Sequence, residues 1–502
     1  MVRRTPVVTL AAAVLACAFP AGAGAARVLV LDHGRVRATE QPGVGAADPL
    51  PPRGAAAGSS PAARAAAKPP GPTVRAELDR LLAEGMIDLP TRDRYRAAYD
   101  DAQATLERLH GRRLTELKAV VANLDAVAAA HGLRPDRLSL AFLTLERNRT
   151  WWTSGPLTRY GQRVAFGSSL VVWQSYPGQG LQVQWLGTFG KANALWQGGR
   201  RYDLKLRALL DEITPLATAR AGGLAFESWF RFDGGRPPWV SALSTGTALQ
   251  VYSRAAIRLQ DPALFGVARS LLGVYRTPPP EGVRVATPAG AHYLIYSFAP
   301  KVRVLNAFIQ ALNGLYDFGK LANDPEGRAL MAQGDVQARV ELPHFDTGAW
   351  SRYAWPGRES DLGYHELLRG FLDGLCARER EAAAAPSPEL PAPDPTPYCA
   401  QAARYTAYLH EPPVLALQAA RPAKPRVRRA VRVPYTLSKV STVATLVTQG
   451  GRPVAGRTMR LGRGRHELRF TPRAPGAYAV RVRAVDLAGN AAQATGAVRA
   501  TR

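Results

Sequence analysis

The sequence is poor in the residues that build metal centres, with 3 cysteines and 8 histidines among 502 residues. His365-Glu366 has no second histidine at helical spacing, which a zinc hydrolase needs for its two imidazole ligands. Gly462 and Gly464 lie in an alternating strand pattern and not in a strand–helix unit, so they do not form a dinucleotide-binding loop. The sequence therefore predicts neither a metal site nor a cofactor.

Acidic residues are also scarce, because 39 Asp and Glu stand against 65 Lys and Arg and give a formal net charge of +26. Such a surplus attracts polyanions: nucleic acid, an anionic surface or an acidic polysaccharide. Only 8 of the basic residues are lysine, and an Ala-, Gly-, Pro- and Arg-rich composition also arises from a GC-rich coding bias. There is no zinc finger, RNA-stacking motif or basic heptad helix, so nucleic acid is not the expected partner.

After the N-terminus, the chain has no apolar run long enough to cross a bilayer, so no transmembrane span is expected. Residues 1–25 have the pattern of a signal peptide, with Arg3-Arg4, a short apolar core and small residues that favour cleavage after Ala23 or Ala25. Alternatively, Cys17 becomes the lipidated first residue of a lipoprotein. Both alternatives predict a secreted or cell-surface protein.

Removal of the leader leaves two cysteines, Cys376 and Cys399. A pair in an oxidising compartment is a candidate disulfide, and two free thiols are the alternative.

Composition divides the rest of the chain. Residues 26–72 are rich in Ala, Gly and Pro and predict a disordered linker, with a brief β-like stretch at 27–31. Residues 73–410 show mainly helical periodicity, and residues 411–432 form a basic, proline-punctuated linker. From 433 to 502 the apolar period becomes two with glycine turns, which predicts a β-sandwich.

Three turns in the helical region each carry a tyrosine, namely Tyr296, Tyr353 and Tyr364. Phenols held at helix ends take or give protons when the surrounding site lowers their pKa. Aromatic packing is the alternative.

The order of motifs across residues 225–376 resembles the C-terminal domain of the D-glucuronyl C5-epimerases. The stretches that carry the resemblance are Trp239-x-Ser241-Ala242-x-x-x-Gly246, Tyr296 with Pro300, Val304-Leu305-Asn306-x-Phe308, Gly314-Leu315-Tyr316-Asp317, Leu342-Pro343-x-x-Asp346-Thr347-Gly348, Tyr353 and Tyr364-His365. The resemblance implies an α/α barrel or toroid for the helical domain. The C-terminal segment from Gly476 to Asn490 resembles bacterial Ig-like modules.

The resemblance also implies a reaction, which converts glucuronosyl to iduronosyl units within an acidic polysaccharide without metal or nucleotide. Tyr364 would be the acid/base on one ring face, while Tyr353 and Tyr296 would position or polarise the carboxylate. Asn306 would support the cleft, and Arg303 or Arg358 would supply the charge clamp. His365 and Trp185 complete the predicted substrate-binding set, although most tryptophans of this region are expected to pack. A dimer is left open.

One position departs from the family. The animal enzymes carry a glutamate immediately before the first tyrosine, and this chain has Ile295. Glu227, Tyr293 or His292 would have to replace it. Two alternatives follow: a polysaccharide lyase that uses Tyr364 and His365 on the same enolate intermediate, and a non-catalytic protein that binds uronic-acid glycans.

Overall fold

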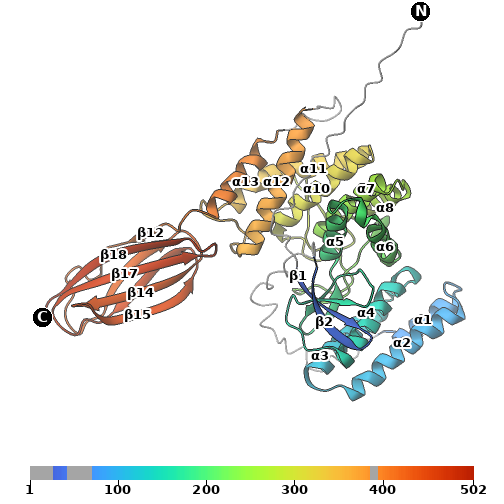
Figure 1. Ribbon diagram of the computed structural model, residues 1–502, viewed down its shortest axis with the longest axis horizontal. Coiled ribbons are helices and arrows are strands. Elements are labelled where there is room, and N and C mark those ends of the chain that lie inside the picture. The colour runs from blue at the N-terminus through green and yellow to red at the C-terminus, as the bar shows by residue number, and fades with distance from the viewer. Residues whose placement is uncertain (1–25, 42–70, 385–393) are drawn as a thin grey trace, which may run out of the picture.

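The computed structural model describes residues 26–41, 71–384 and 394–502. A helical body is followed by an all-β domain that projects from one side of it (Figure 1). The predicted signal peptide and most of the predicted linker lie outside the described residues. No helix in the described ranges combines the length and apolarity that a membrane crossing requires. The helices are α1 Val74–Ala83, α2 Leu89–Arg108, α3 Gly111–Ala129, α4 Pro135–Ser154, α5 Trp185–Gln197, α6 Asp203–Ile213, α7 Ala242–Arg258, α8 Ala263–Leu271, α9 Gly273–Arg276, α10 Leu305–Leu321, α11 Pro325–Glu341, α12 Leu362–Ala384 and α13 Thr396–Tyr408.

The predicted β-like stretch at 27–31 is confirmed, but the predicted linker is wrong for the rest of 26–41, because these residues form the antiparallel pair β1 (Ala26–Asp32) and β2 (Arg35–Gln41). β1 also pairs in parallel with β3 (Arg163–Phe166) in a sheet of order β2-β1-β3-β4-β5, where β4 is Trp173–Tyr176 and β5 is Gly180–Val183. Val28 and Val30 pack against Ala165 in this sheet. The partner of β1, strand β3, lies more than a hundred residues further along the chain, and local composition does not reveal this pairing.

Helices α7 and α10 run in the same direction. Near their starts Gln310 donates to Thr247 over 3.1 Å, and further along both helices Arg254 donates to Asp317 over 2.9 Å. The backbones approach closely, because a Cβ at Gly314 would lie 2.1 Å from the carbonyl oxygen of Gly246. The close helix packing thus requires glycine at positions 246 and 314, both of which belong to the motifs that carry the family resemblance.

The same parallel order extends to the neighbouring helices. Asn313 donates to the Phe371 carbonyl over 3.0 Å and Arg378 donates to Asp317 over 2.6 Å, which aligns α12 with α10. Arg254 donates to Asn193 over 2.9 Å, and one turn further along both helices Arg258 lies 5.4 Å from the centroid of the Trp196 ring, so α5 runs in the same direction as α7. Helices α5, α7, α10 and α12 therefore form a parallel inner row, and α6, α8, α11 and α13 each pack beside the inner helix that precedes them (Figure 1).

Two short hairpins lie in the connections between these helices. One pairs β6 (Thr218–Arg220) with β7 (Gly223–Ala225), and the other pairs β8 (Arg284–Ala286) with β9 (Ala291–Tyr293). The second hairpin leads directly into the segment that carries Ile295 and Tyr296.

The C-terminal domain consists of two antiparallel sheets, in agreement with the apolar alternation. One has the order β12-β13-β16 and the other β15-β14-β17-β18. The strands are β12 Leu415–Leu417, β13 Val431–Leu437, β14 Ser441–Gln449, β15 Arg452–Leu461, β16 Gly464–Phe470, β17 Gly476–Asp486 and β18 Ala491–Ala500. The predicted 411–432 linker is wrong in part, because β12 and the first residues of β13 already belong to the sheet.

Candidate functional site

Tyr353 and Tyr364 lie against each other, with ring centroids 4.4 Å apart. Tyr353 precedes β11 (Ala354–Trp355), which pairs with β10 (Arg303–Val304) immediately before α10. Tyr364 lies in the first turn of α12. Tyr353 is buried and Tyr364 is half-buried. Two of the three predicted phenols thus meet where two parallel helices begin.

This end of the inner row favours negative charge. The first turns of parallel helices leave backbone N–H groups without intrahelical partners, and their dipoles point the same way. The first turns of α10 and α12 flank the tyrosine pair. Carboxylates and enolates are the ligands that such an environment stabilises.

His365 holds the loop that carries Tyr353. Its ring stacks on Trp350 with centroids 3.8 Å apart, and its Nδ1 lies 2.8 Å from the Ser351 hydroxyl. Its Nε2 lies 2.9 Å from the Tyr405 carbonyl oxygen, and burial lowers the pKa of the imidazole to about 4. The prediction that His365 binds substrate is therefore wrong, because the side chain is fully buried and both ring nitrogens contact protein groups.

The two predicted arginines border the tyrosine pair differently. The exposed Arg358 guanidinium lies over the Tyr353 ring, 5.0 Å from its centroid, and the Arg358 carbonyl accepts a hydrogen bond from the Tyr353 amide over 2.9 Å. Arg303 pairs through its backbone with Trp355, while its guanidinium donates to the Pro300 carbonyl over 2.8 Å. Of the two, Arg358 is the cation directly beside a predicted catalytic phenol.

Tyr296 belongs to a different aromatic cluster. It packs against Phe232, Trp239 and Phe298 with centroid distances of 5.4, 5.5 and 5.2 Å. Tyr176 from β4 extends the same cluster through Phe232. The half-buried Tyr296 therefore lies on an aromatic wall built by the 226–240 segment, and the motif alone did not indicate this packing.

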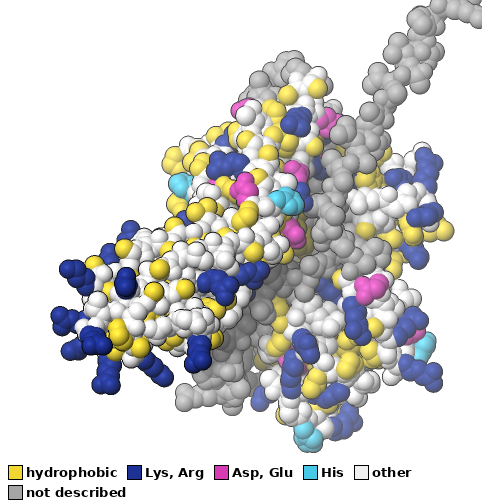
Figure 2. Space-filling model, turned by 60° about the vertical axis from the view of Figure 1, so that its left-hand side comes forward, with side chains coloured by type: hydrophobic (Ala, Val, Ile, Leu, Met, Phe, Trp, Pro, Cys, Tyr) yellow, Lys and Arg dark blue, Asp and Glu magenta, His cyan; other side chains and the backbone are white. Residues whose placement is uncertain are grey.

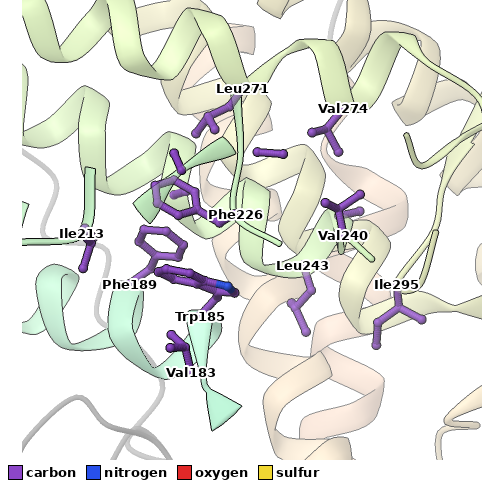
Figure 3. Close-up of a cluster of buried hydrophobic side chains, with 14 of the residues drawn as sticks. Val183, Trp185, Phe189, Ile213, Phe226, Val240, Leu243, Leu271, Val274 and Ile295 are labelled. Atoms are coloured by element: carbon purple, nitrogen blue, oxygen red, sulfur yellow. The ribbon is translucent and has the colours of Figure 1, made fainter. Parts of the chain in front are cut away.

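Ile295 is buried among apolar side chains and is 5 % exposed. Figure 3 shows it in one hydrophobic cluster with Leu243, Val240 and Trp185. Trp185 is also core: it stacks on Phe189 at 5.9 Å, and its indole N–H donates to the Glu227 carbonyl over 2.8 Å. The prediction of Trp185 as a sugar-stacking residue is wrong, because its ring is enclosed by other aromatics.

Two of the three candidate substitutes for the missing glutamate are held by the protein itself. Glu227 is buried between Arg137 and Arg220, which donate over 2.7 and 2.8 Å. The Tyr293 hydroxyl donates to the Leu330 carbonyl over 2.6 Å, and burial raises its pKa. Because of these contacts, Glu227 and Tyr293 are structural residues of the protein interior.

The third candidate, His292, forms a buried dyad with Glu341, a residue that sequence reasoning missed. The His292 Nδ1 and a Glu341 carboxylate oxygen are 2.8 Å apart. Burial lowers the pKa of His292, and although burial alone would raise the pKa of Glu341, its hydrogen bond with His292 holds it below the ordinary value. The imidazole is therefore neutral and donates to the carboxylate. Among the described residues, its buried Nε2 has no hydrogen-bond partner.

Asn306 lies in the first turn of α10 and is 3 % exposed. Its amide oxygen has no hydrogen-bond partner among the described residues. Asp317, from the same helix, instead accepts hydrogen bonds from Arg254 and Arg378. Of these two motif residues of α10, Asn306 thus lies near the helix start beside the tyrosine pair, whereas Asp317 is a structural carboxylate further along the helix.

No group of three or more His, Cys, Asp or Glu side chains capable of holding a metal occurs in the part of the chain that the structure describes. Cys376 and Cys399 form a disulfide that joins α12 to α13, with Cα atoms 4.9 Å apart.

Comparison with known families identifies the segment that carries this geometry. Residues 224–382 match the family described as D-glucuronyl C5-epimerase C-terminus, and this range contains Tyr296, Tyr353 and Tyr364. A search of curated proteins finds no match to the chain. The match therefore covers the segment that supplies α7, α10, most of α12 and the tyrosine pair, and this segment is similar to the C-terminal domain of the D-glucuronyl C5-epimerases.

Proposed function

We propose that the helical domain binds a glucuronic-acid polysaccharide and acts on the C5 proton of a uronosyl unit, as a C5-epimerase. The observation that carries this proposal is the contact between Tyr353 and Tyr364, 4.4 Å apart at the starts of parallel helices within the matched segment. The four inner helices with their outer partners fit one part of an α/α toroid. In that architecture, helix starts and loops surround the substrate.

Each side chain of the site would have one role in the removal of the C5 proton. Removal of the C5 proton, alpha to the carboxylate, needs a base and stabilisation of the resulting enolate. Tyr364, half-buried at the start of α12, would exchange the proton. Tyr353 would donate a hydrogen bond to the carboxylate, and Arg358 beside the Tyr353 ring would balance the developing charge. Asn306 contributes an unpartnered amide oxygen near the start of α10.

Ile295 limits what the site does on the opposite ring face, because an apolar side chain carries no proton. The proton exchange at C5 on one face is thus the minimal reaction that the arrangement supports, and inversion requires a second donor. The lyase alternative loses support, since it relied on His365, whose ring nitrogens already contact Ser351 and Tyr405.

A non-catalytic glycan-binding protein is the second candidate. It is favoured by the apolar surroundings of Ile295 and by the protein contacts of Glu227 and Tyr293. Such a protein would retain the carboxylate-binding end of the helices without turning over its ligand.

Deuterium exchange separates the two candidates. The full-length protein is incubated with heparosan in deuterated water, and the loss of the uronate H5 signal is followed by NMR. We expect exchange with the unchanged protein and a loss of about 100-fold or more in Tyr364→Phe, because a positioned acid/base contributes about 10²–10⁴-fold.

Tyr202→Phe, at a half-buried tyrosine outside the matched segment, serves as the control and should exchange normally. Binding without exchange, unaffected by Tyr364→Phe, would refute the enzyme and support the binding protein. An unsaturated product that absorbs in the ultraviolet would restore the lyase.

A further inference from the structure

We propose that the outward face of the sheet β15-β14-β17-β18 is a second binding surface for an acidic polysaccharide. The strand register places Arg460 beside Thr442, Arg483 beside Ala444 and Arg481 beside Leu446. These positions alternate with the buried Val443 and Val447, so all of them point away from the sandwich core. The three arginines are exposed. They form what we call the arginine face.

The C-terminal domain has few carboxylates that could neutralise the arginine face. Residues 433–502 hold 12 Lys and Arg against 2 Asp and Glu. Within the described residues, only Lys439, Arg463 and Arg469 of those twelve form ion pairs. The helical body behaves differently, since many of its arginines pair with carboxylates, as Arg378 does with Asp317.

Folding does not account for this distribution. Like charges on one face of a sheet destabilise it, and an exposed arginine contributes little to a β-sandwich whose core is built from buried apolar side chains. The same imbalance extends over the domain surface, because Figure 2 shows other basic side chains gathered at the far end of the sandwich without acidic ones among them. A ligand that brings its own negative charge would relieve the repulsion.

The geometry favours a glycan over nucleic acid. Arg481 and Arg483 are two residues apart on β17, so their guanidinium groups project about 7 Å apart along the strand. Each guanidinium binds a carboxylate through two parallel hydrogen bonds. The register-matched neighbours on β14 and β18 are Thr, Ala, Leu and Gln, with no aromatic ring on which a single-stranded base would stack. A repeating carboxylate chain meets the requirements of such a flat, basic surface.

The sandwich also contacts the loop of the candidate site. Arg463 forms an ion pair with Glu359 at 3.0 Å, and Lys439 lies 5.6 Å from the centroid of the Trp350 ring. The arginine face and the tyrosine pair thus belong to two domains in direct contact. Only the identity of the polymer as a uronic-acid glycan rests on the proposed function; the binding surface itself does not.

Binding of heparosan to the full-length protein tests the inference, because the anions of this polymer are uronate carboxylates. In Arg460→Ser/Arg481→Ser/Arg483→Ser we expect a Kd at least about tenfold weaker at roughly 0.15 M salt, with a shallower salt dependence. Exposed strand positions tolerate such changes without loss of the fold.

The matched control replaces with serine three arginines on the outward side of the other sheet, Arg432, Arg465 and Arg469. Its Kd should change less than about twofold, although the net charge falls equally. Equal weakening in both variants, absence of heparosan binding, or equally tight binding of duplex DNA would overturn the inference. Tyr364→Phe separates the two proposals, since it should abolish C5 exchange and leave binding to the arginine face intact.

Discussion

Replacing Asp317 with Asn should strongly destabilise the helical body, because this buried carboxylate connects α7, α10 and α12. Arg378 donates to both carboxylate oxygens over 2.6 and 2.8 Å, and Arg254 adds a third contact at 2.9 Å. Burial alone would raise the pKa of Asp317, but the two guanidinium groups hold it below its ordinary value. The carboxylate is therefore charged and pairs with both arginines.

The expected magnitude follows from the charges left behind. Removing one partner of a buried ionic cluster leaves the others uncompensated and costs about 3–5 kcal/mol. For a domain of this size, about 1 kcal/mol corresponds to roughly 2–4 °C, so the helical transition should fall by roughly 6–20 °C. Circular dichroism in the helical band follows this transition, because the sandwich contributes little helix signal.

Asp373→Asn is the matched control on α12. Asp373 pairs with Arg369 at i,i+4 spacing and is half exposed, so its loss should cost about 0.5 kcal/mol or less. If Asp317→Asn unfolds within about 1 kcal/mol of the unchanged protein, the ionic cluster does not hold the inner helices together. The reasoning about the inner row would then be refuted.

Three other predictions concern the loop and the end of the helical body. Because the pKa of His365 falls from 6.5 to about 4 on folding, the unfolded chain binds more protons between these values, and stability should drop by about 3 kcal/mol as pH falls through that window. Urea titrations at several pH values measure this slope. Arg463→Ser breaks the partly exposed pair with Glu359, so it should cost less than about 1 kcal/mol yet slow C5 exchange several-fold. Serine at both Cys376 and Cys399 should cost about 3 kcal/mol, the loop-closure value for a separation of 23 residues.

Each of these has a contradicting outcome. If the free energy of unfolding changes with pH in His365→Gln as it does in the unchanged protein, the imidazole does not cause this dependence. Exchange that is unaffected by Arg463→Ser would show that the sandwich does not position the Tyr353 loop. Identical melting curves with and without reductant would show that the disulfide does not stabilise α12 and α13.

Local sequence signals locate most of the regular elements. Ser241 and Asp324 accept hydrogen bonds from backbone amides at the starts of α7 and α11, and such capping residues mark a helix start in the sequence itself. Strands β13, β14 and β17 of the sandwich follow the apolar alternation, because they bury alternate side chains along most of their length. Of the hairpin at 26–41 the sequence indicates only the β-like stretch at 27–31, since the stability of the hairpin depends on β3, far along the chain.

The order of residues is enough to identify the three candidate phenols, the helical and β-rich regions, the surplus of arginine and the lack of an acid at position 295. Three further features become visible only in the folded chain: Tyr353 contacts Tyr364, His365 and Trp185 are buried, and Glu227 lies between two arginines. The reason is physical: helix and strand signals act over a few residues, whereas the environment of a side chain depends on segments brought together only by folding.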